Sequence, residues 1–387
     1  MNLAIKDIRF NFGRFLLTAA GVGFLVTASI GMVGLYRGIV SDALLIIDNI
    51  GADLWIVQGG RAGPFAESSS ISSSMDRRAE GLPGVTRIRR FIQISQQFSF
   101  QGTERRAAIT GLDYPKDKGE WLSLHSGTYL NSGHFQAIAD QSIGLALGDR
   151  ICLGLDEYTI VGLTRGMVDS TGDGLLFVTI NDATAIATKR ESEEILLARQ
   201  ANGEAIPSSD SSSSVQQDSK ISAVLADLDP GADPAAVRSA ILDWGDANVL
   251  DRAEQRSLLL DQRLWRLRIQ ILAFTGVLLI VMTIVISMII YTLTIEKLHQ
   301  IAMLKLIGAR NLVIVAMIAQ QSALIGAGGF VLGLLLSYLI FPYFPRRVVI
   351  EALDVAGFAI AIAIICASAS LFGISRALKV RAQEVLS

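Results

Sequence analysis

Charged residues are scarce in this sequence. Asp, Glu, Lys and Arg make up 18% of its 387 residues, against about a quarter in soluble domains, and the mean hydropathy is +0.46. This composition indicates a membrane protein. The formal net charge is -2 and the pI about 6.0, so the chain lacks the concentrated basic field that nucleic acid requires. We expect no nucleic acid among its partners.

Cysteine and histidine are also rare. The two cysteines, Cys152 and Cys366, cannot build a disulfide framework, and the second lies inside an apolar run. The three histidines, His125, His134 and His299, are scattered without the spacing of a metal site. We expect neither a metal nor another cofactor.

Two catalytic patterns are missing as well. The sequence contains no G-x-x-x-x-G-K-[ST] phosphate-binding loop and no G-x-S-x-G nucleophile elbow. We therefore expect that the chain is not an enzyme and does not hydrolyse ATP itself.

The sequence does contain four long apolar runs. Each is long enough to cross a bilayer as a helix and contains no Asp, Glu, Lys or Arg: 15–36, 269–295, 312–341 and 355–375. The first run is longer than the apolar core of a cleaved signal peptide, so we interpret it as a retained helix. Because ionisable groups inside the membrane usually carry proton-coupled transport, their absence predicts that energy comes from a partner.

Glycines gather in the third run, at Gly326, Gly328, Gly329 and Gly333. Small residues allow helices to approach closely, so we interpret them as packing positions rather than a gate.

Basic residues near the run ends indicate the orientation. Three flanks carry three positive charges each and are predicted to be cytoplasmic: Lys6, Arg9 and Arg14, then Lys297, Lys305 and Arg310, then Arg376, Lys379 and Arg381. Five arginines count against this orientation: Arg263, Arg266, Arg268, Arg346 and Arg347. The balance puts both termini in the cytoplasm and the large region after the first run outside it.

That large region has the pattern of a folded α+β domain. Strands are predicted at 91–100, 150–154, 158–162, 175–179 and 221–228, and a helix at 235–244. The serine-rich stretches 68–74 and 208–214 are predicted to be mobile loops. Residues 251–268 have helical spacing, and fit either a stalk running into the second span or a separate surface helix.

The fold class predicted is an α-helical membrane protein with four transmembrane helices and an α+β extracytoplasmic domain. Its expected divisions are a cytoplasmic N-terminal segment (1–14), a first span (15–40), the outer domain (41–250), a stalk (251–268), a second span (269–295), a cytoplasmic loop (296–311), a third span (312–341), a short outer loop (342–354), a fourth span (355–375) and a cytoplasmic tail (376–387). The family resemblance described below implies that 1–14 is an amphipathic entry helix and that 296–311 is a coupling loop.

The cytoplasmic loop between the second and third spans is the most informative segment. Leu298, Ile301 and Ala302 fall on one face at helical spacing, and Gly308 is a stop signal. The pattern predicts an amphipathic helix, and periodicity alone does not decide between a partner-binding helix and one resting in the headgroup layer.

The same loop resembles a family signature. Glu296-Lys297, Ile301, Leu304-Lys305 and Ile307-Gly308-Ala309 resemble the E-R-x-x-E-I-G-x-L-[RK]-A-[IL]-G-A pattern of FtsX-like and MacB-like permeases of ABC transporters, with Gln300, Ala302 and Leu306 as departures. The resemblance implies a coupling helix received by a groove on an ABC ATPase. The implied ATPase-coupling residues are Glu296, Lys297, His299, Gln300, Ile301, Leu304, Lys305, Gly308 and Ala309.

Other segments resemble the same family. Residues 3–9 and 14–17 are similar to its N-terminal helix, residues 376–380 and 384–386 to its tail, and residues 51–57 and 296–299 look most like the DevC-type subfamily. The resemblance implies the permease subunit of an ATP-driven exporter in the inner membrane, with its large domain in the periplasm. It implies a homodimer with an ABC ATPase that passes ATPase motion to the outer domain by mechanotransmission.

The DevC-type resemblance further implies a membrane-fusion protein and an outer-membrane channel, in a tripartite efflux or lipid or glycolipid export system, with membrane lipid as a further partner. The alternative is an FtsX-like regulator of a cell-wall hydrolase that transports nothing.

Overall fold

The computed structural model describes residues 12–189, 219–307, 311–344 and 346–379. The chain divides into two compact units. The helical unit comprises Met1–Gly38 and Arg266–Ser387, and the sheet unit comprises Ile39–Trp265.

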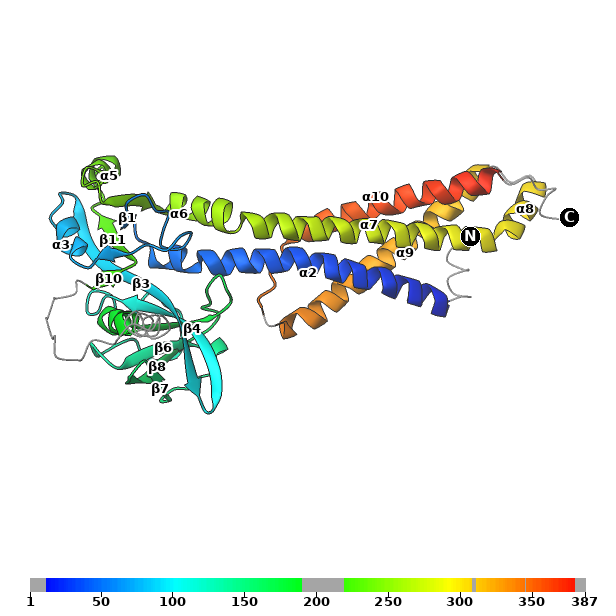
Figure 1. Ribbon diagram of the computed structural model, residues 1–387. Helices are drawn as coiled ribbons and strands as arrows, with labels where there is room; N and C mark the ends of the chain where they lie inside the picture. Colours follow the sequence, from blue (N-terminus) through cyan, green and yellow to red (C-terminus); the bar gives the residue numbers. More distant parts are fainter. Residues whose placement is uncertain (1–11, 190–218, 308–310, 345, 380–387) are drawn as a thin grey trace, which may run out of the picture. The chain divides into compact units, whose positions relative to one another are not determined.

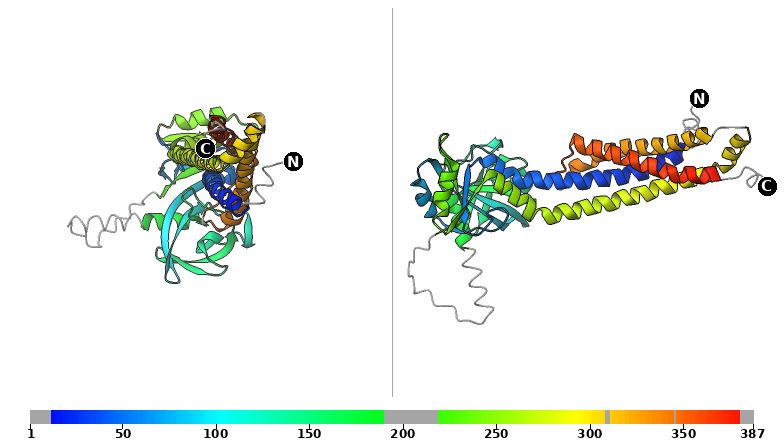
Figure 2. Two further views of the ribbon diagram at one scale, coloured as in Figure 1. Left: turned by 90° about the vertical axis from the view of Figure 1, so that its right-hand side faces the viewer. Right: turned by 90° about the horizontal axis from the view of Figure 1, so that it is seen from above.

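Long helices build the helical unit and run side by side (Figures 1 and 2). The elements are α2 (Phe12–Ile50), α7 (Trp265–Glu296), α8 (Leu298–Leu306), α9 (Asn311–Ile340), η3 (Phe341–Tyr343) and α10 (Ala352–Lys379). In the described ranges, four helices are long and apolar enough to span a membrane: Phe15–Ile50, Trp265–Glu296, Leu312–Tyr343 and Ala352–Leu371. The predicted four spans are confirmed. Residues 1–11 and 380–387, which include most of the predicted N-terminal helix and tail, lie outside the described residues.

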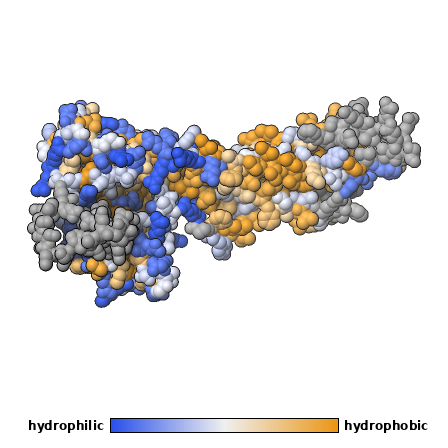
Figure 3. All heavy atoms as spheres, viewed as in Figure 1, coloured by the Kyte–Doolittle hydropathy of each residue, from blue (hydrophilic) through white to orange (hydrophobic). Residues whose placement is uncertain are grey.

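The surface of the long helices is apolar. Ile284 and Met288 on α7 and Ile364 on α10 are each more than half exposed, and Figure 3 shows hydrophobic residues gathered over the long helices. Exposing such side chains to water costs free energy, whereas contact with lipid chains does not. This surface therefore fits a bilayer.

Glycines bring α9 close to α2. A Cβ added at Gly329 would lie 2.5 Å from Val22 Cγ1, and one at Gly333 would lie 2.7 Å from Val26 Cβ. Thr27 Oγ1 also donates a hydrogen bond to the Gly333 carbonyl at 2.9 Å. The packing interpretation of these glycines is confirmed, because any larger side chain would push the helices apart.

The sheet unit contains a ten-stranded mixed sheet. Its strands are β1 (Leu54–Gln58), β3 (Val85–Phe100), β4 (Thr103–Leu112), β5 (Leu124–Gly127), β6 (Gln136–Asp140), β7 (Arg150–Leu153), β8 (Asp156–Thr164), β9 (Gly174–Thr179), β11 (Ala223–Leu228) and β12 (Ala247–Asp251). They pair in the order β12-β1-β11-β3-β4-β9-β6-β8-β5, with β7 beside β8. The pairs β4–β9 and β6–β8 are parallel, whereas the other pairs are antiparallel. The predicted α+β domain is confirmed.

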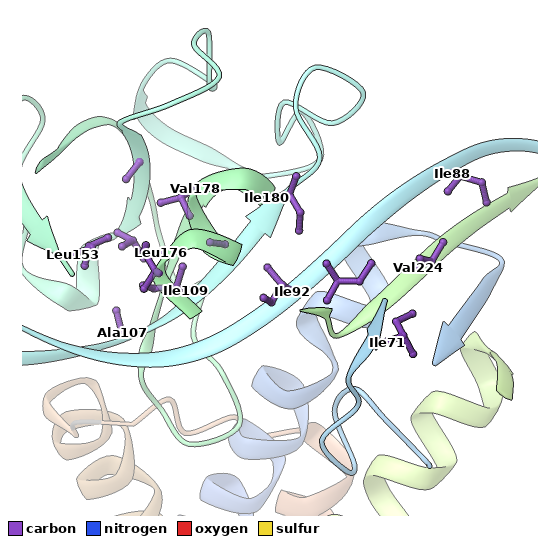
Figure 4. Close-up of a cluster of buried hydrophobic side chains, with 14 of the residues drawn as sticks. Ile71, Ile88, Ile92, Ala107, Ile109, Leu153, Leu176, Val178, Ile180 and Val224 are labelled. Atoms are coloured by element: carbon purple, nitrogen blue, oxygen red, sulfur yellow. The ribbon is translucent and has the colours of Figure 1, made fainter. Parts of the chain in front are cut away.

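Shorter elements complete the sheet unit. These are β2 (Ile71–Ser72) paired with β10 (Lys220–Ile221), α3 (Met75–Glu80), η1 (Gln141–Ile143), α5 (Pro234–Leu242), α6 (Arg252–Leu258), the π-helical turn η2 (Leu259–Arg263), and helical residues 180–189. Isoleucine, leucine and valine from both ends of the sheet fill its core, and Figure 4 shows Ile109, Leu153 and Leu176 gathered between strands.

Two predicted segments differ from expectation. The serine-rich stretch 68–74 is held in place, because Ile71 and Ser72 pair with β10 and the Gln58 backbone N–H donates to Ser69 Oγ at 3.0 Å. The stretch 208–214 lies outside the described residues. The predicted stalk 251–268 is divided among α6, η2 and the start of α7, and Asp251 belongs to β12 while capping α6.

Candidate functional site

The loop predicted to couple to an ATPase contains the short helix α8. The Ile301 backbone N–H donates to the Lys297 carbonyl at 2.9 Å, and Ile307 N–H donates to the Met303 carbonyl at 3.1 Å, so helical bonding extends past both ends of α8. Ile301 and Ala302 are each only 1% exposed, and Ile301 packs into the hydrophobic cluster of the helical unit. This inward face anchors α8 to the spans.

The outward face of α8 is partly apolar. His299 and Gln300 are exposed, Met303 is 48% exposed and Ile307 is 84% exposed. Residues four apart lie on one face of a helix, so Met303 and Ile307 form an adjacent exposed pair. A paired apolar surface beside polar residues fits a contact with another protein.

The structure divides the predicted coupling residues into groups. Glu296 ends α7, Lys297 precedes α8, and His299 and Gln300 are exposed on α8, whereas Ile301 is buried. Leu304 and Lys305 belong to α8, and Gly308 and Ala309 lie outside the described residues. Sequence reasoning missed Met303 and did not single out Ile307. Their four-residue spacing was the available signal.

In the sheet unit, a buried arginine fastens the end of α2. Arg89 on β3 is 2% exposed, and its Nη2 donates to the Ile50 carbonyl at 3.3 Å and to Asp227 Oδ1 at 3.0 Å. Its Nη1 donates to Asp117 Oδ2 at 3.3 Å. A cation suits the carbonyl end of a helix, where the helix dipole is negative. The two carboxylates compensate the buried charge of the guanidinium.

A second fastening joins α2 to α6 within the sheet unit. Arg256 Nη1 lies 2.8 Å from Asp48 Oδ1. The start of α6 is fixed by a capping box, in which Asp251 Oδ1 accepts from Glu254 N–H at 2.7 Å and Glu254 Oε2 accepts from Asp251 N–H at 3.0 Å. The Asp48–Arg256 ion pair therefore ties the last turn of α2 to the last turn of α6.

An aromatic cluster of Trp55, Phe65 and Phe91 packs in the same sheet unit. Trp55 on β1 packs edge-on against Phe65 and Phe91, with ring centroids 5.3 Å and 5.4 Å away. Gln255 of α6, which is fully buried, donates from Nε2 to the Gly63 carbonyl at 2.8 Å. Arg263 Nη1 donates to the Phe65 carbonyl at 2.5 Å. These contacts hold the residue 58–70 loop against α6 and η2.

Two ionisable side chains of the sheet unit, His134 and Tyr158, have hydrogen-bonding or buried environments that fit a structural role. His134 Nδ1 lies 2.7 Å from Asp182 Oδ1. The backbone N–H of Phe135 donates to the other oxygen of the same carboxylate, Asp182 Oδ2, at 3.0 Å. Burial raises the pKa of Tyr158 well above its usual value, and the charges of Asp182 and Asp156 add to this effect. Over the described ranges, no group of three His, Cys, Asp or Glu residues could hold a metal ion.

The fold and the α8 helix define a class, the permeases with a MacB-like outer domain and an FtsX-like membrane part. Residues 15–243 match the MacB-like periplasmic core domain, and residues 272–382 match the FtsX-like permease C-terminal domain. The chain belongs to this family of ABC transporter permeases. It is a multi-pass inner-membrane protein with its large domain in the periplasm, and family membership implies an ATPase partner.

Known proteins similar to this chain include two named permeases and one solved periplasmic region. The chain is 22% identical over 347 residues to an uncharacterized ABC transporter permease of Mycobacterium bovis, covering 90% of this chain and 88% of the relative. It is 26% identical over 175 residues to the putative hemin transport system permease protein HrtB of Staphylococcus epidermidis, covering 44% of this chain and 47% of that protein. The periplasmic region of MacB from Actinobacillus actinomycetemcomitans aligns with 52% of this chain and 90% of its own, at 9% identity and a TM-score of 0.37.

Proposed function

We propose that this permease serves an ATP-driven exporter by passing movement of its ATPase through the spans to the periplasmic sheet unit. One observation carries the proposal. The helix α2 runs unbroken for 39 residues from Phe12 to Ile50, and its last turn is fastened by Arg89 and by the Asp48–Arg256 ion pair. A continuous helix with a fastened end transmits displacement, whereas a flexible linker would absorb it.

The spans favour transmission over passage of a hydrophilic solute. Their central stretches, 15–36, 269–295, 312–341 and 355–375, contain no charged side chain. A hydrophilic solute crossing between helices needs polar or charged groups along its path. In this proposal the movement passed on from the ATPase therefore acts on a substrate at the periplasmic face.

On the cytoplasmic side, α8 delivers the movement. In our proposal Met303 and Ile307 enter the groove of the ATPase, with His299 and Gln300 beside them. Ile301 contributes by holding α8 against the spans. The charged residues Glu296, Lys297 and Lys305 contribute to the same contact.

The coupling contact is tested by Met303→Glu with Ile307→Glu in the complex with the cognate ATPase. Burying an aliphatic side chain contributes about 1.5–3 kcal/mol, so we expect ATPase affinity to fall about tenfold or more, with loss of permease-dependent ATP turnover. The matched control is Leu155→Glu in the sheet unit, because Leu155 is also apolar and 82% exposed.

Glu296→Lys combined with Lys305→Glu tests the charges of the same loop, and we expect turnover to fall without loss of membrane insertion. Unchanged ATPase binding and turnover in both double variants would remove the coupling role from α8.

The assembly follows from the same proposal. Two permeases, each with an ATPase, form the working unit, and a membrane-fusion protein and an outer-membrane channel complete a tripartite DevC-type system for efflux or for lipid or glycolipid export. Cross-linking of the periplasmic unit in intact cells should capture the membrane-fusion protein. A permease that cross-links only to a cell-wall hydrolase would contradict this assembly.

A further inference from the structure

The loop between α9 and α10 carries two arginines on the side of the membrane where positive charge is depleted. In a chain with a periplasmic domain after the first span, the connection between the third and fourth spans is also periplasmic. Arg346 and Arg347 therefore run against the usual concentration of basic residues on the cytoplasmic side. The coupling mechanism gives them no role.

The two arginines line a groove of about 450 Å³ in the helical unit. Its other walls come from the end of α9 and from η3, including Ser337, Tyr338 and Phe341. Arg346 is half-buried and Arg347 exposed. Among the described residues, no carboxylate lies within 4 Å of either guanidinium, so their charge is available to a ligand.

The carboxylates nearby in the sequence are already engaged. Arg37 of α2 contacts Asp354 through Nε and Oδ2 at 2.5 Å and through Nη2 and Oδ1 at 2.8 Å. The same guanidinium contacts Glu351 Oε1 through Nη1 at 2.6 Å. Both acids therefore already have a basic partner in Arg37, and neither forms a described ion pair with Arg346 or Arg347.

The backbone of the loop is fixed against α2. The Val349 N–H donates to the Gly34 carbonyl at 3.0 Å. A Cβ at Gly34 would lie 2.6 Å from Val348 Cγ1, and one at Gly38 would overlap the Arg347 carbonyl oxygen. The two glycines, one turn apart, provide the space in which the loop lies. The arginines therefore start from an ordered backbone, which lowers the entropy cost of binding.

An apolar strip continues from the groove along α9. Leu335 is 63% exposed, Tyr338 83% and Leu339 64%. Tyrosine is enriched at the height of lipid headgroups, and leucine in the lipid chain region. A ligand with an anionic head and a hydrocarbon tail would satisfy both the guanidinium groups and this strip.

We propose that this groove binds an anionic phospholipid of the outer leaflet of the inner membrane. The phosphate contacts the guanidinium groups of Arg346 and Arg347, whose planar donor arrangement matches phosphate oxygens. An acyl chain lies along Leu335 and Leu339. A free phosphate ion would use the arginines but leave the apolar strip unexplained. The inference does not depend on the exporter proposal, since it concerns lipid binding by the permease alone.

The test is native mass spectrometry of the purified full-length permease, mixed with phosphatidylglycerol or phosphatidylcholine. We expect preferential retention of phosphatidylglycerol, and a loss of at least about tenfold in Arg346→Gln with Arg347→Gln, the size of losing one to two charge-assisted contacts. The matched control is Arg266→Gln with Arg268→Gln, which removes the same charge from exposed arginines flanking the second span on the periplasmic side.

Several outcomes would overturn the proposal. These are equal retention of the two lipids, retention by the Arg346/Arg347 variant, and equal loss in the control variant. Displacement of the lipid by millimolar inorganic phosphate would assign the arginines to a soluble anion instead. If the glutamine variant does not insert, Arg346→Lys with Arg347→Lys keeps the charge, and we expect weaker but measurable preference because the bidentate geometry is lost.

Discussion

At the scale of single residues, Arg89 is the position on which the fastening of α2 most depends. Its guanidinium is the cation shared by Asp117, Asp227 and the Ile50 carbonyl. Removing one member of a buried ion pair leaves uncompensated charge, which typically costs 3–5 kcal/mol. We expect Arg89→Ala to lower the unfolding temperature of the full-length protein by about 10 °C.

Arg87 provides the matched control. It contacts the same Asp227 at 2.7 Å, but its side chain is 50% exposed, so solvent screens the pair. We expect Arg87→Ala to cost less than about 1 kcal/mol. Tryptophan fluorescence is the measurement, because all four tryptophans, at 55, 121, 244 and 265, lie in the sheet unit. Equal shifts in the two variants would refute the special role of Arg89.

Sequence patterns could not reveal this residue. Arg89 stands in a strand with two other arginines, Arg87 and Arg90, and nothing in the sequence distinguishes the three. Its partners are 28 and 138 positions away, at Asp117 and Asp227. Asp227 reaches Arg89 because β11 pairs with β3, whereas Asp117 lies in the segment after β4, and periodicity encodes neither long-range contact.

At the scale of elements, the spans were predictable and the strand order was not. A bilayer imposes a length and a charge-free core on each helix, so 269–295 and 312–341 could be recognised directly. The strands 91–100 and 175–179 could also be recognised from composition. However, the strand order could not be predicted: β1 lies between β11 and β12, and β4 pairs in parallel with β9. Such neighbours are far apart in the sequence, and the local residue pattern of a strand does not specify its partner.

The surface of α8 was only half predictable. The inward face of α8, with Ile301 and Ala302, followed from helical spacing. The outward apolar pair of Met303 and Ile307 did not stand out, because apolar residues on both faces of a short helix remove its periodic signal. Exposure in the folded unit was needed to separate anchoring residues from contact residues.

The continuity of α2 gives a prediction at the same scale. Ser41 is exposed, so Ser41→Pro removes no packing, but proline in a helix interior removes a backbone hydrogen bond and kinks the chain. We expect the ATPase complex to assemble normally, because α8 is unchanged. A fluorophore on Cys152 of the sheet unit should report an ATP-driven change in the parent protein that falls several-fold in the proline variant.

The control for this variant is Ser41→Ala, which keeps the helix and should retain the full ATP-driven signal. Thermal unfolding should show that the sheet unit stays folded in both. An undiminished signal in Ser41→Pro would mean that displacement does not pass through α2.

At the scale of the whole molecule, the parts of the chain on the two sides of the membrane and inside it differ in the side chains that they expose. In the proposed mechanism, the short helix α8 presents exposed apolar residues to the ATPase, and the periplasmic unit presents a ten-stranded sheet with fastened helix ends. The central stretches of the four spans contain no Asp, Glu, Lys or Arg. In this proposal the ATP chemistry belongs to the partner, and the permease responds to the partner's movement.

The two native cysteines allow this arrangement to be tested without introducing new ones. Cys152 lies exposed on β7 of the sheet unit, whereas Cys366 is buried in the fourth span beside Gly326. A membrane-impermeant maleimide added to intact spheroplasts should therefore label one site per chain, and Cys152→Ser should abolish the labelling. Labelling of Cys152 only after the membrane is permeabilised would place the sheet unit in the cytoplasm. In that case α8 and the sheet unit would face the wrong compartments for ATPase movement to reach a periplasmic substrate, and the coupling mechanism would fail.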